Sequence, residues 1–321
     1  MNMRTAFSGR EVAAALAVVL IWGLNFVAMK LALREFTPMQ LGAWRYVFAA
    51  APLLVLLRRP PVPLRWLALY GLVQGLGQFG LLFLALQWGM TAAVASVLMQ
   101  TQVFFTALLG WFLLQERLTP AQAGGLGLAL LGLVCFGMHF STLERGGPGL
   151  GVTGFVLTLG AAAMWGASSI VARRLQQRHP GYDAVQFVVW SSLFPILPFL
   201  ALSHWLDGPQ ALSRLGQISW TAWGGAAYLG LFATVVAYGL WTWLLKRRPA
   251  NQVAPIGLGV PVIGLLAGVW LLDERLSAWQ WAGIAGIAAS LVYAMTPRTR
   301  KAAHTGAAVP PIPAKPSHQP D

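Results

Sequence analysis

Arg45 is the residue best suited to specific chemistry, because it is a charged side chain inside an apolar stretch of the chain. A charge near the centre of a bilayer costs about 2.5–3.5 kcal/mol on insertion scales, so its presence needs a reason. A guanidinium group binds a carboxylate through two parallel hydrogen bonds, which predicts that Arg45 anchors the carboxylate of a solute. Two alternatives remain: Arg45 extends toward the membrane surface, where Glu35 could meet it, or it binds carbonyl groups of a broken helix.

Uncharged polar side chains recur at helical spacing in two further apolar stretches. Gln74 and Gln78 are four residues apart, as are Ser96 and Gln100, so each pair shares a helix face, whereas Gln102 is expected to point elsewhere. Amides and hydroxyls recognise amino and carboxylate groups without a fixed charge. The alternative is hydrogen bonding between helices.

Thr234, Tyr238 and Trp241 form a similar stripe later in the chain. A wet central cavity would explain these sets together. The predicted substrate-binding residues are Arg45, Gln74, Gln78, Gln100, Tyr238 and Trp241. Trp22, Asn25 and Trp165 are candidates for a gate or for the lining of the path, with plain packing as the alternative.

Catalytic chemistry is not predicted. All nine acidic residues lie in loops, at helix ends or in the tail, and the five histidines lie at span edges or in the tail. The single cysteine, Cys135, suggests neither a disulfide nor a metal site. Residues 149–154 match G-x-G-x-x-G but open an apolar span rather than follow a strand, so no dinucleotide site is expected. We therefore predict no enzyme activity, no cofactor and no metal.

The elements that position these residues are membrane-spanning helices. The chain has 321 residues, of which 57% are hydrophobic and 10% charged. A soluble domain is about 25% charged, so a soluble enzyme, a nucleic-acid-binding domain and a disordered protein are disfavoured. Runs of about 20 apolar residues suit helices that cross a bilayer. Ten are predicted, at Val12–Met29, Met39–Leu57, Trp66–Leu86, Thr91–Leu114, Ala121–Phe140, Gly149–Val171, Ala184–Leu202, Trp220–Leu245, Asn251–Leu272 and Ala278–Met295.

Positive charge predicts the orientation. With the N-terminus in the cytoplasm, sixteen arginine and lysine residues fall on the cytoplasmic side and five on the other. The net charge of +13 is then explained by topology rather than by nucleic acid. We expect both termini to be cytoplasmic: a short segment at residues 1–11 and a proline-rich, disordered tail at residues 296–321.

The two halves of the chain resemble each other. An offset of 143 places Trp22 on Trp165 and Lys30 on Arg173, and an offset of 158 places Glu116-Arg117-Leu118 on Glu274-Arg275-Leu276. Five spans per half is an odd number, so the halves, residues 12–140 and 149–295, are predicted to be inverted relative to each other, as in many transporters. Each Glu-Arg-Leu turn is expected to bond helix ends, and Thr119 and Ser277 to cap the helices that follow.

These motifs carry a family resemblance. The runs at residues 21–27, 100–106, 115–118, 189–199 and 273–276, together with Arg45, resemble the EamA family of the drug/metabolite transporter superfamily. The resemblance covers about residues 11–295. It implies a cavity lined chiefly by helices 3, 4, 8 and 9, and is nearest to a subgroup that exports cysteine-pathway metabolites such as O-acetylserine and cysteine.

We therefore predict an all-α protein of the bacterial inner membrane that exports small amino-acid-like solutes by alternating access. Its expected partners are that solute and the lipid bilayer, with no nucleic acid, and the oligomeric state is open. The alternatives are a carrier of the same superfamily for another small organic solute, a membrane scaffold without a solute path, and an intramembrane enzyme.

Overall fold

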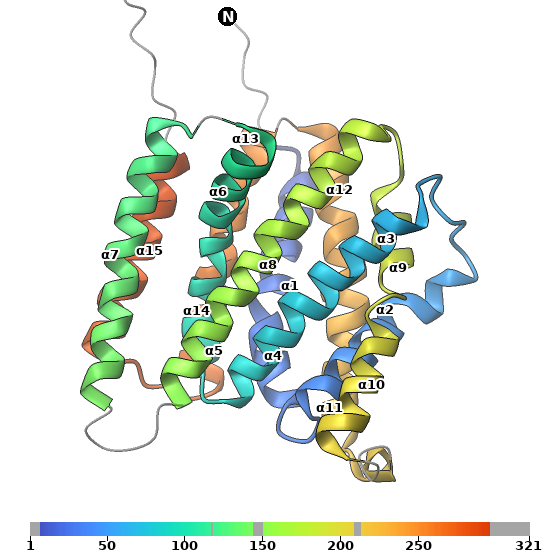
Figure 1. Ribbon diagram of the computed structural model, residues 1–321, viewed down its shortest axis with the longest axis horizontal. Helices are drawn as coiled ribbons and strands as arrows, with labels where there is room; N and C mark the ends of the chain where they lie inside the picture. Colours follow the sequence, from blue (N-terminus) through green and yellow to red (C-terminus); the bar gives the residue numbers. More distant parts are fainter. Residues whose placement is uncertain (1–6, 117, 144–149, 209–212, 249, 296–321) are drawn as a thin grey trace, which may run out of the picture.

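The computed structural model describes residues 7–116, 118–143, 150–208, 213–248 and 250–295. Over these residues the regular structure is entirely helical, which confirms the predicted all-α class. The helices lie side by side in one bundle (Figure 1). The predicted disordered tail, residues 296–321, and residues 1–6 of the predicted N-terminal segment lie outside the described residues.

Helices occupy each of the ten positions predicted from the sequence. The first half contains α1 (Gly9–Ala32), α2 (Pro38–Leu54), α3 (Leu64–Tyr70), η1 (Gly71–Phe79), α4 (Gly80–Gln87), α5 (Ala92–Leu98), η2 (Met99–Thr101), α6 (Gln102–Leu114) and α7 (Pro120–Leu143). The second half contains α8 (Leu150–Arg178), α9 (Ala184–Ser191), α10 (Ile196–Asp207), η4 (Ser213–Gln217), α11 (Trp220–Ala227), η5 (Tyr228–Val236), α12 (Ala237–Arg247), α13 (Ala250–Val253), η6 (Ala254–Leu258), α14 (Gly259–Leu271) and α15 (Ala278–Met295).

Seven helical segments of the described chain are long and apolar enough to cross a membrane. They are Gly9–Ala32, Leu64–Gln87, Ala92–Leu114, Pro120–His139, Gly151–Arg178, Ala184–Asp207 and Trp220–Arg247. The helices α2, α14 and α15, at the other three predicted positions, are not among the seven. The count of ten spans therefore stays a prediction.

Side-chain caps fix where several helices begin. Ser8 and Glu11 form a reciprocal capping box at α1, and Thr37 and Gln40 form one at α2. The predicted caps before α7 and α15 are confirmed. The Thr119 hydroxyl accepts the backbone N–H three residues on at 3.2 Å, and Ser277 does the same in the second half. Each cap satisfies backbone N–H groups that have no partner within the helix.

Two nine-residue π-helices, η1 and η5, interrupt the long helices near the middle of each half. Their bounds differ by 157 positions, close to the offset that relates the Glu-Arg-Leu turns. A π-helix is rare and often marks a functional site, because its wider turn shifts which side chains face inward. Neighbouring helices lie close to both: a Cβ on Gly230 of η5 would be 2.5 Å from the Arg45 carbonyl oxygen of α2.

Packing between the halves surrounds a central region. The α7 helix packs along α15 at one side of the bundle, while α1 packs on α14, α6 on α8 and α2 on α10 (Figure 1). The seventh predicted span is broken by a turn at residues 192–195, before α10, which fits the proline that ends it. The main core cluster contains residues of both halves, among them Met29, Leu98 and Ile287.

Candidate functional site

A cavity of about 440 Å³ lies at the centre of the bundle. This volume is within the range of small-molecule sites, about 300–1,000 Å³. Helices from both halves line it, and eight of the nine residues singled out in the sequence are on its wall. They are Trp22, Asn25, Arg45, Gln78, Gln100, Trp165, Tyr238 and Trp241. The structure thus brings together side chains that the sequence scatters over more than 200 positions.

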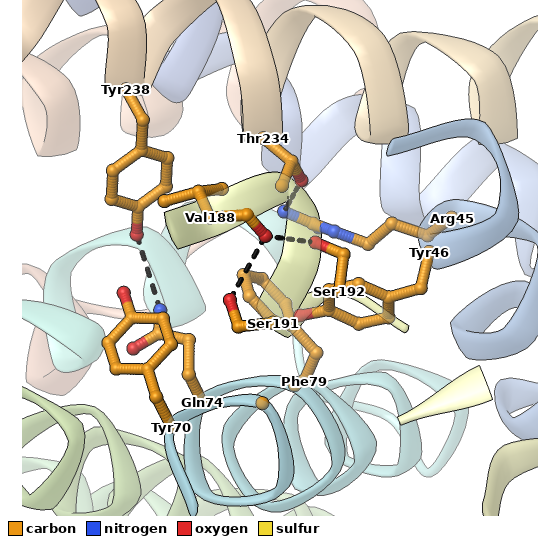
Figure 2. Close-up of a pocket in the computed structure, with 12 residues that line it drawn as sticks. Arg45, Tyr46, Tyr70, Gln74, Phe79, Val188, Ser191, Ser192, Thr234 and Tyr238 are labelled. Carbon is orange, nitrogen blue, oxygen red and sulfur yellow. Dashed lines mark hydrogen bonds between the residues drawn. The ribbon is translucent and has the colours of Figure 1, made fainter. Parts of the chain in front are cut away.

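Arg45 reaches this cavity from α2 and is only 2% exposed. Its Nη2 donates a hydrogen bond to the Thr234 hydroxyl at 3.1 Å, and its Cζ lies 3.6 Å from the centre of the Phe79 ring (Figure 2). Its Nε and Nη1 have no hydrogen-bond partner among the described residues, nor does any described carboxylate form an ion pair with it. A buried cation with two unused donors is suited to binding an anionic group.

Two residues of the same cavity wall carry unused acceptors. The side-chain oxygens of Asn25 and Gln78 are buried and accept no hydrogen bond from the described residues. Both side chains are more than nine-tenths buried. A buried polar atom without a partner costs about 1–3 kcal/mol, so these oxygens have a strong preference for a donor. Residues of the cavity wall therefore carry unused donors at Arg45 and unused acceptors at Asn25 and Gln78, the two kinds of group that a zwitterionic headgroup needs.

Aromatic rings form a wall of the cavity. The Trp22 ring centre is 5.2 Å from that of Tyr238, edge to face, and 5.5 Å from that of Trp241. The Trp22 indole donates to the Ala233 carbonyl at 3.0 Å, which fixes its orientation. Such rings can cover an apolar side chain or the face of a cation.

Gln74 lies in a small pocket next to the cavity rather than in the cavity itself. This pocket shares Arg45, Phe79 and Tyr238 with the cavity, and its volume is about 20 Å³. The Gln74 amide donates to the Tyr238 hydroxyl at 3.2 Å (Figure 2). The Gln74 side-chain oxygen also accepts a hydrogen bond from the Ser168 hydroxyl. Its polar groups are thus used within the protein, which favours a role in positioning Tyr238.

Serines of the broken helix form the far side of the small pocket. The hydroxyls of Ser191 and Ser192 both donate to the Val188 carbonyl, at 3.0 and 2.7 Å (Figure 2). Each hydroxyl hydrogen is thus used where α9 ends. Ser191 and Ser192 are not among the predicted binding residues, because their spacing matches no helical stripe.

Three details differ from the sequence predictions. Gln102 does line the cavity, although it was expected to point elsewhere, because the η2 turn changes the helical phase after Leu98. Ser96 does not line the cavity, and its hydroxyl donates to the Ala93 carbonyl at 2.8 Å, a bond within its own helix. Glu35 does not meet Arg45 but accepts two hydrogen bonds from Ser219, both at 2.6 Å.

A second, polar space of about 520 Å³ adjoins the cavity, and we call it the vestibule. It shares Gln102 and Val103 with the cavity and extends to Glu116, which follows α6, and to Arg173 of α8. The C-terminal end of α6 lies at the upper end of the bundle in Figure 1. At the lower end, the first residues of α5 are packed and fully buried. The central cavity therefore continues toward one end of the bundle.

Comparison with known proteins identifies the class. The sequence profile of the EamA-like transporter family matches this chain twice, over residues 9–138 and 152–296. The chain belongs to the EamA-like transporter family. Two separate matches, one in each half, agree with the internal resemblance seen in the sequence.

Curated relatives carry a consistent description. The chain is 40% identical over 278 residues to a probable amino-acid metabolite efflux pump of Salmonella typhimurium (strain LT2), covering 86% of this chain and 92% of that protein. It is 38% identical over 300 residues to the protein of the same description from Escherichia coli (strain K12), covering 91% and 97%. A crystal structure that covers 90% of this chain and 97% of its own has a TM-score of 0.57 at 21% identity, a likeness of fold.

Proposed function

We propose that this protein is a secondary transporter that exports small amino-acid-like metabolites, of the O-acetylserine and cysteine type, across the bacterial inner membrane. The observation that carries the proposal is the set of unused donors and acceptors on residues that line the central cavity. The unpartnered donors of Arg45 would bind the carboxylate of the solute, and the free oxygens of Asn25 and Gln78 would accept hydrogen bonds from its ammonium group. The names of the relatives support the solute class.

The remaining cavity residues have complementary roles in this proposal. Gln100 contributes a further amide, while Trp22, Tyr238 and Trp241 cover the solute's side chain and Trp165 lines the path. Gln74 orients Tyr238 through its hydrogen bond. No residue has a catalytic role in the proposal.

The proposed architecture is ten membrane-spanning helices in two inverted five-helix repeats, residues 12–140 and 149–295. Inverted repeats around a central site are the basis of alternating access. The reciprocal packing supports this arrangement: α1 packs on α14 as α6 packs on α8, and α4 packs on α8 as α12 packs on α1. The equivalent positions of η1 and η5 support it as well.

We infer that both termini are cytoplasmic. The first turn of α1 and the last turn of α15 lie at the same end of the bundle, the upper end in Figure 1. The predicted excess of arginine and lysine is on that side. The vestibule then opens toward the cytoplasm, the side from which an exporter takes its solute. A reporter fused to the C-terminus should read as cytoplasmic, and an extracytoplasmic signal would overturn the orientation.

A headgroup series tests the proposed solute class. Thermal unfolding of the purified protein would be measured with three solutes. Cysteine presents both charges, cysteine methyl ester lacks the carboxylate, and N-acetylcysteine lacks the ammonium group. A ligand at 100 times its Kd stabilises the folded state against unfolding by about 2.7 kcal/mol, so binding appears as a rise in Tm. We expect the rise with cysteine and with O-acetylserine only.

Each other outcome has a definite meaning. Equal stabilisation by the methyl ester would contradict carboxylate binding at Arg45. Stabilisation by a sugar or a hydrophobic solute, with none by amino acids, would favour the alternative of a carrier for another small organic solute. The aromatic wall around Trp22 makes hydrophobic solutes the informative competitors.

A further inference from the structure

The two Glu-Arg-Leu turns have the same backbone geometry. Gln115 and Asp273, the residues that precede the glutamates, both have left-handed backbone conformations, with φ of 56° and 53°. Glu116 and Glu274 each donate their backbone N–H to the glycine six residues earlier, at 3.2 Å in both halves. The turns are therefore structural copies, and a difference between their carboxylates reflects a difference between the two ends of the bundle.

The Glu274 carboxylate closes the lower end. It accepts the backbone N–H groups of Ala92 and Ala93, the first two residues of α5, at 2.6 and 2.8 Å. Lys30 of α1 is close enough to interact electrostatically with Glu274, and its Nζ donates to two carbonyls beside the α4–α5 turn, both at 2.8 Å. These contacts tie the second half of the chain to the first at this end.

The Glu116 carboxylate is engaged differently. It forms an ion pair with Arg173 at 2.6 Å, and both side chains are more than 40% exposed. Arg173 is the counterpart of Lys30 at the offset of 143, and α13 is the counterpart of the start of α5 at the offset of 158. The carboxylate thus faces the vestibule instead of the start of α13, and the cavity extends toward this end.

We propose that Glu116 and Glu274 are paired latches that exchange partners during the transport cycle, an inference that rests on the alternating access proposed above. When the lower end opens, Glu274 leaves α5 and pairs with Lys30, as Glu116 now pairs with Arg173. At the same time Glu116 leaves Arg173 and accepts backbone N–H groups at the start of α13, which closes the vestibule. Each end is then held by the same carboxylate-to-helix bond in turn.

Elementary electrostatics supports such an exchange. A carboxylate is stabilised at a helix N-terminus by the helix dipole and by charge-assisted hydrogen bonds, and also by a nearby arginine or lysine. The two partners of each glutamate therefore offer comparable stabilisation. Glycine is required beside each carboxylate in its present position, at Gly110 and at Gly268. A Cβ there would be 2.9 Å from Glu116 Oε2 and 2.6 Å from Glu274 Oε2.

The test measures cysteine accessibility without any solute, so its result is independent of the solute class. In a Cys135→Ser background, a Met90→Cys reporter lies beside the Glu274 latch, and a Thr106→Cys reporter lies in the vestibule. An impermeant thiol reagent is added to each side of sealed vesicles in separate experiments. Transport of cysteine by the same variants is measured in parallel.

We expect Glu274→Gln to raise the labelling rate at Met90→Cys by about tenfold or more, equivalent to about 1.4 kcal/mol, and to lower the rate at Thr106→Cys. Glu116→Gln should produce the opposite pair of changes. Asp273→Asn is the matched control, because it removes the same charge from the same turn, and it should change neither rate. Glu274→Asp, with a shorter reach, provides a second variant if Glu274→Gln folds poorly.

The latch exchange would be overturned if Glu274→Gln and Glu116→Gln changed the labelling rates of the two reporters in the same direction. It would also be overturned if neither folded variant changed those rates. Opposite changes without transport of any amino acid would support the latches and remove the proposed solute. The two proposals therefore fail separately.

Discussion

Replacing Arg45 separates a solute anchor from a structural residue. Arg45→Met keeps the length and apolar stem of the side chain but removes its charge and its donors. In the protein without solute, the change removes one hydrogen bond to Thr234 and the contact with the Phe79 ring. It also removes the cost of a buried cation with two unpartnered nitrogens. These effects oppose each other, so the Tm of the empty protein should change little.

Binding should respond much more strongly. Truncating one partner of a buried, hydrogen-bonded charge pair costs about 2–5 kcal/mol, part of it from the unpaired charge left behind. At about 1.4 kcal/mol per tenfold, a loss of about 2–5 kcal/mol weakens binding of a carboxylate solute by about 30- to 4,000-fold. Arg45→Lys should give an intermediate loss, because an ammonium group retains the charge but not the paired donor geometry.

The assay is thermal unfolding across a cysteine titration, with counterflow in proteoliposomes alongside. Arg34→Met is the matched control, because it removes a cation from the exposed turn between α1 and α2. We expect Arg34→Met to bind cysteine with the affinity of the wild-type protein. A large fall in the Tm of empty Arg45→Met, with unchanged affinity for cysteine, would refute the anchor role and support the structural alternative.

Three further predictions follow from other contacts. Gly230→Ala should displace α2 at the Arg45 carbonyl and reduce both stability and transport. The control Gly224→Ala should be tolerated, because a Cβ there would meet no atom within 4 Å. Equal Tm values and equal counterflow rates for the two variants would contradict this. Gln78→Leu should weaken binding of cysteine by about 5- to 140-fold, at about 1–3 kcal/mol for a lost acceptor, and an affinity equal to that of wild type in a cysteine titration followed by Tm would contradict this. Hydrogen bonds from Ser219 hold the pKa of Glu35 below its ordinary value of 4.5, so their stabilisation is present above pH 4.5 and lost as pH falls through the folded-state pKa. The Tm difference between wild type and Glu35→Gln should therefore shrink on acidification, and a difference that grows would refute the assignment.

The sequence was sufficient to predict the helical class and eight of the residues that line the cavity. Polar residues in apolar helices are costly, so they gather where water or solute can meet them. This reasoning selected Arg45 from its type and Gln78 from its type and helical spacing, while Asn25 was a candidate for the gate or path from its place in the repeat. It also selected the rings at Trp22 and Tyr238, which the structure places in contact.

Other features could not be predicted because they depend on helical phase and on contacts between distant segments. The π-helix η1 and the η2 turn change which side chains face inward, and this moved Gln102 onto the cavity wall against expectation. The partners of Arg45 lie on η1 and η5, at Phe79 and Thr234, and an apolar sequence carries no signal for those pairings. The hydrogen bonds of Glu274 to α5 likewise join residues more than 180 positions apart.

Counterflow in proteoliposomes that contain only this protein tests the central claim most directly. Vesicles loaded with unlabelled cysteine, O-acetylserine, other amino acids or sugars would be compared for uptake of labelled cysteine. We predict saturable exchange with amino-acid-like solutes that is lost in Arg45→Met and retained in Arg34→Met. Exchange of cysteine at the wild-type rate by Arg45→Met, or no exchange of any amino acid by folded wild-type protein, would contradict the account.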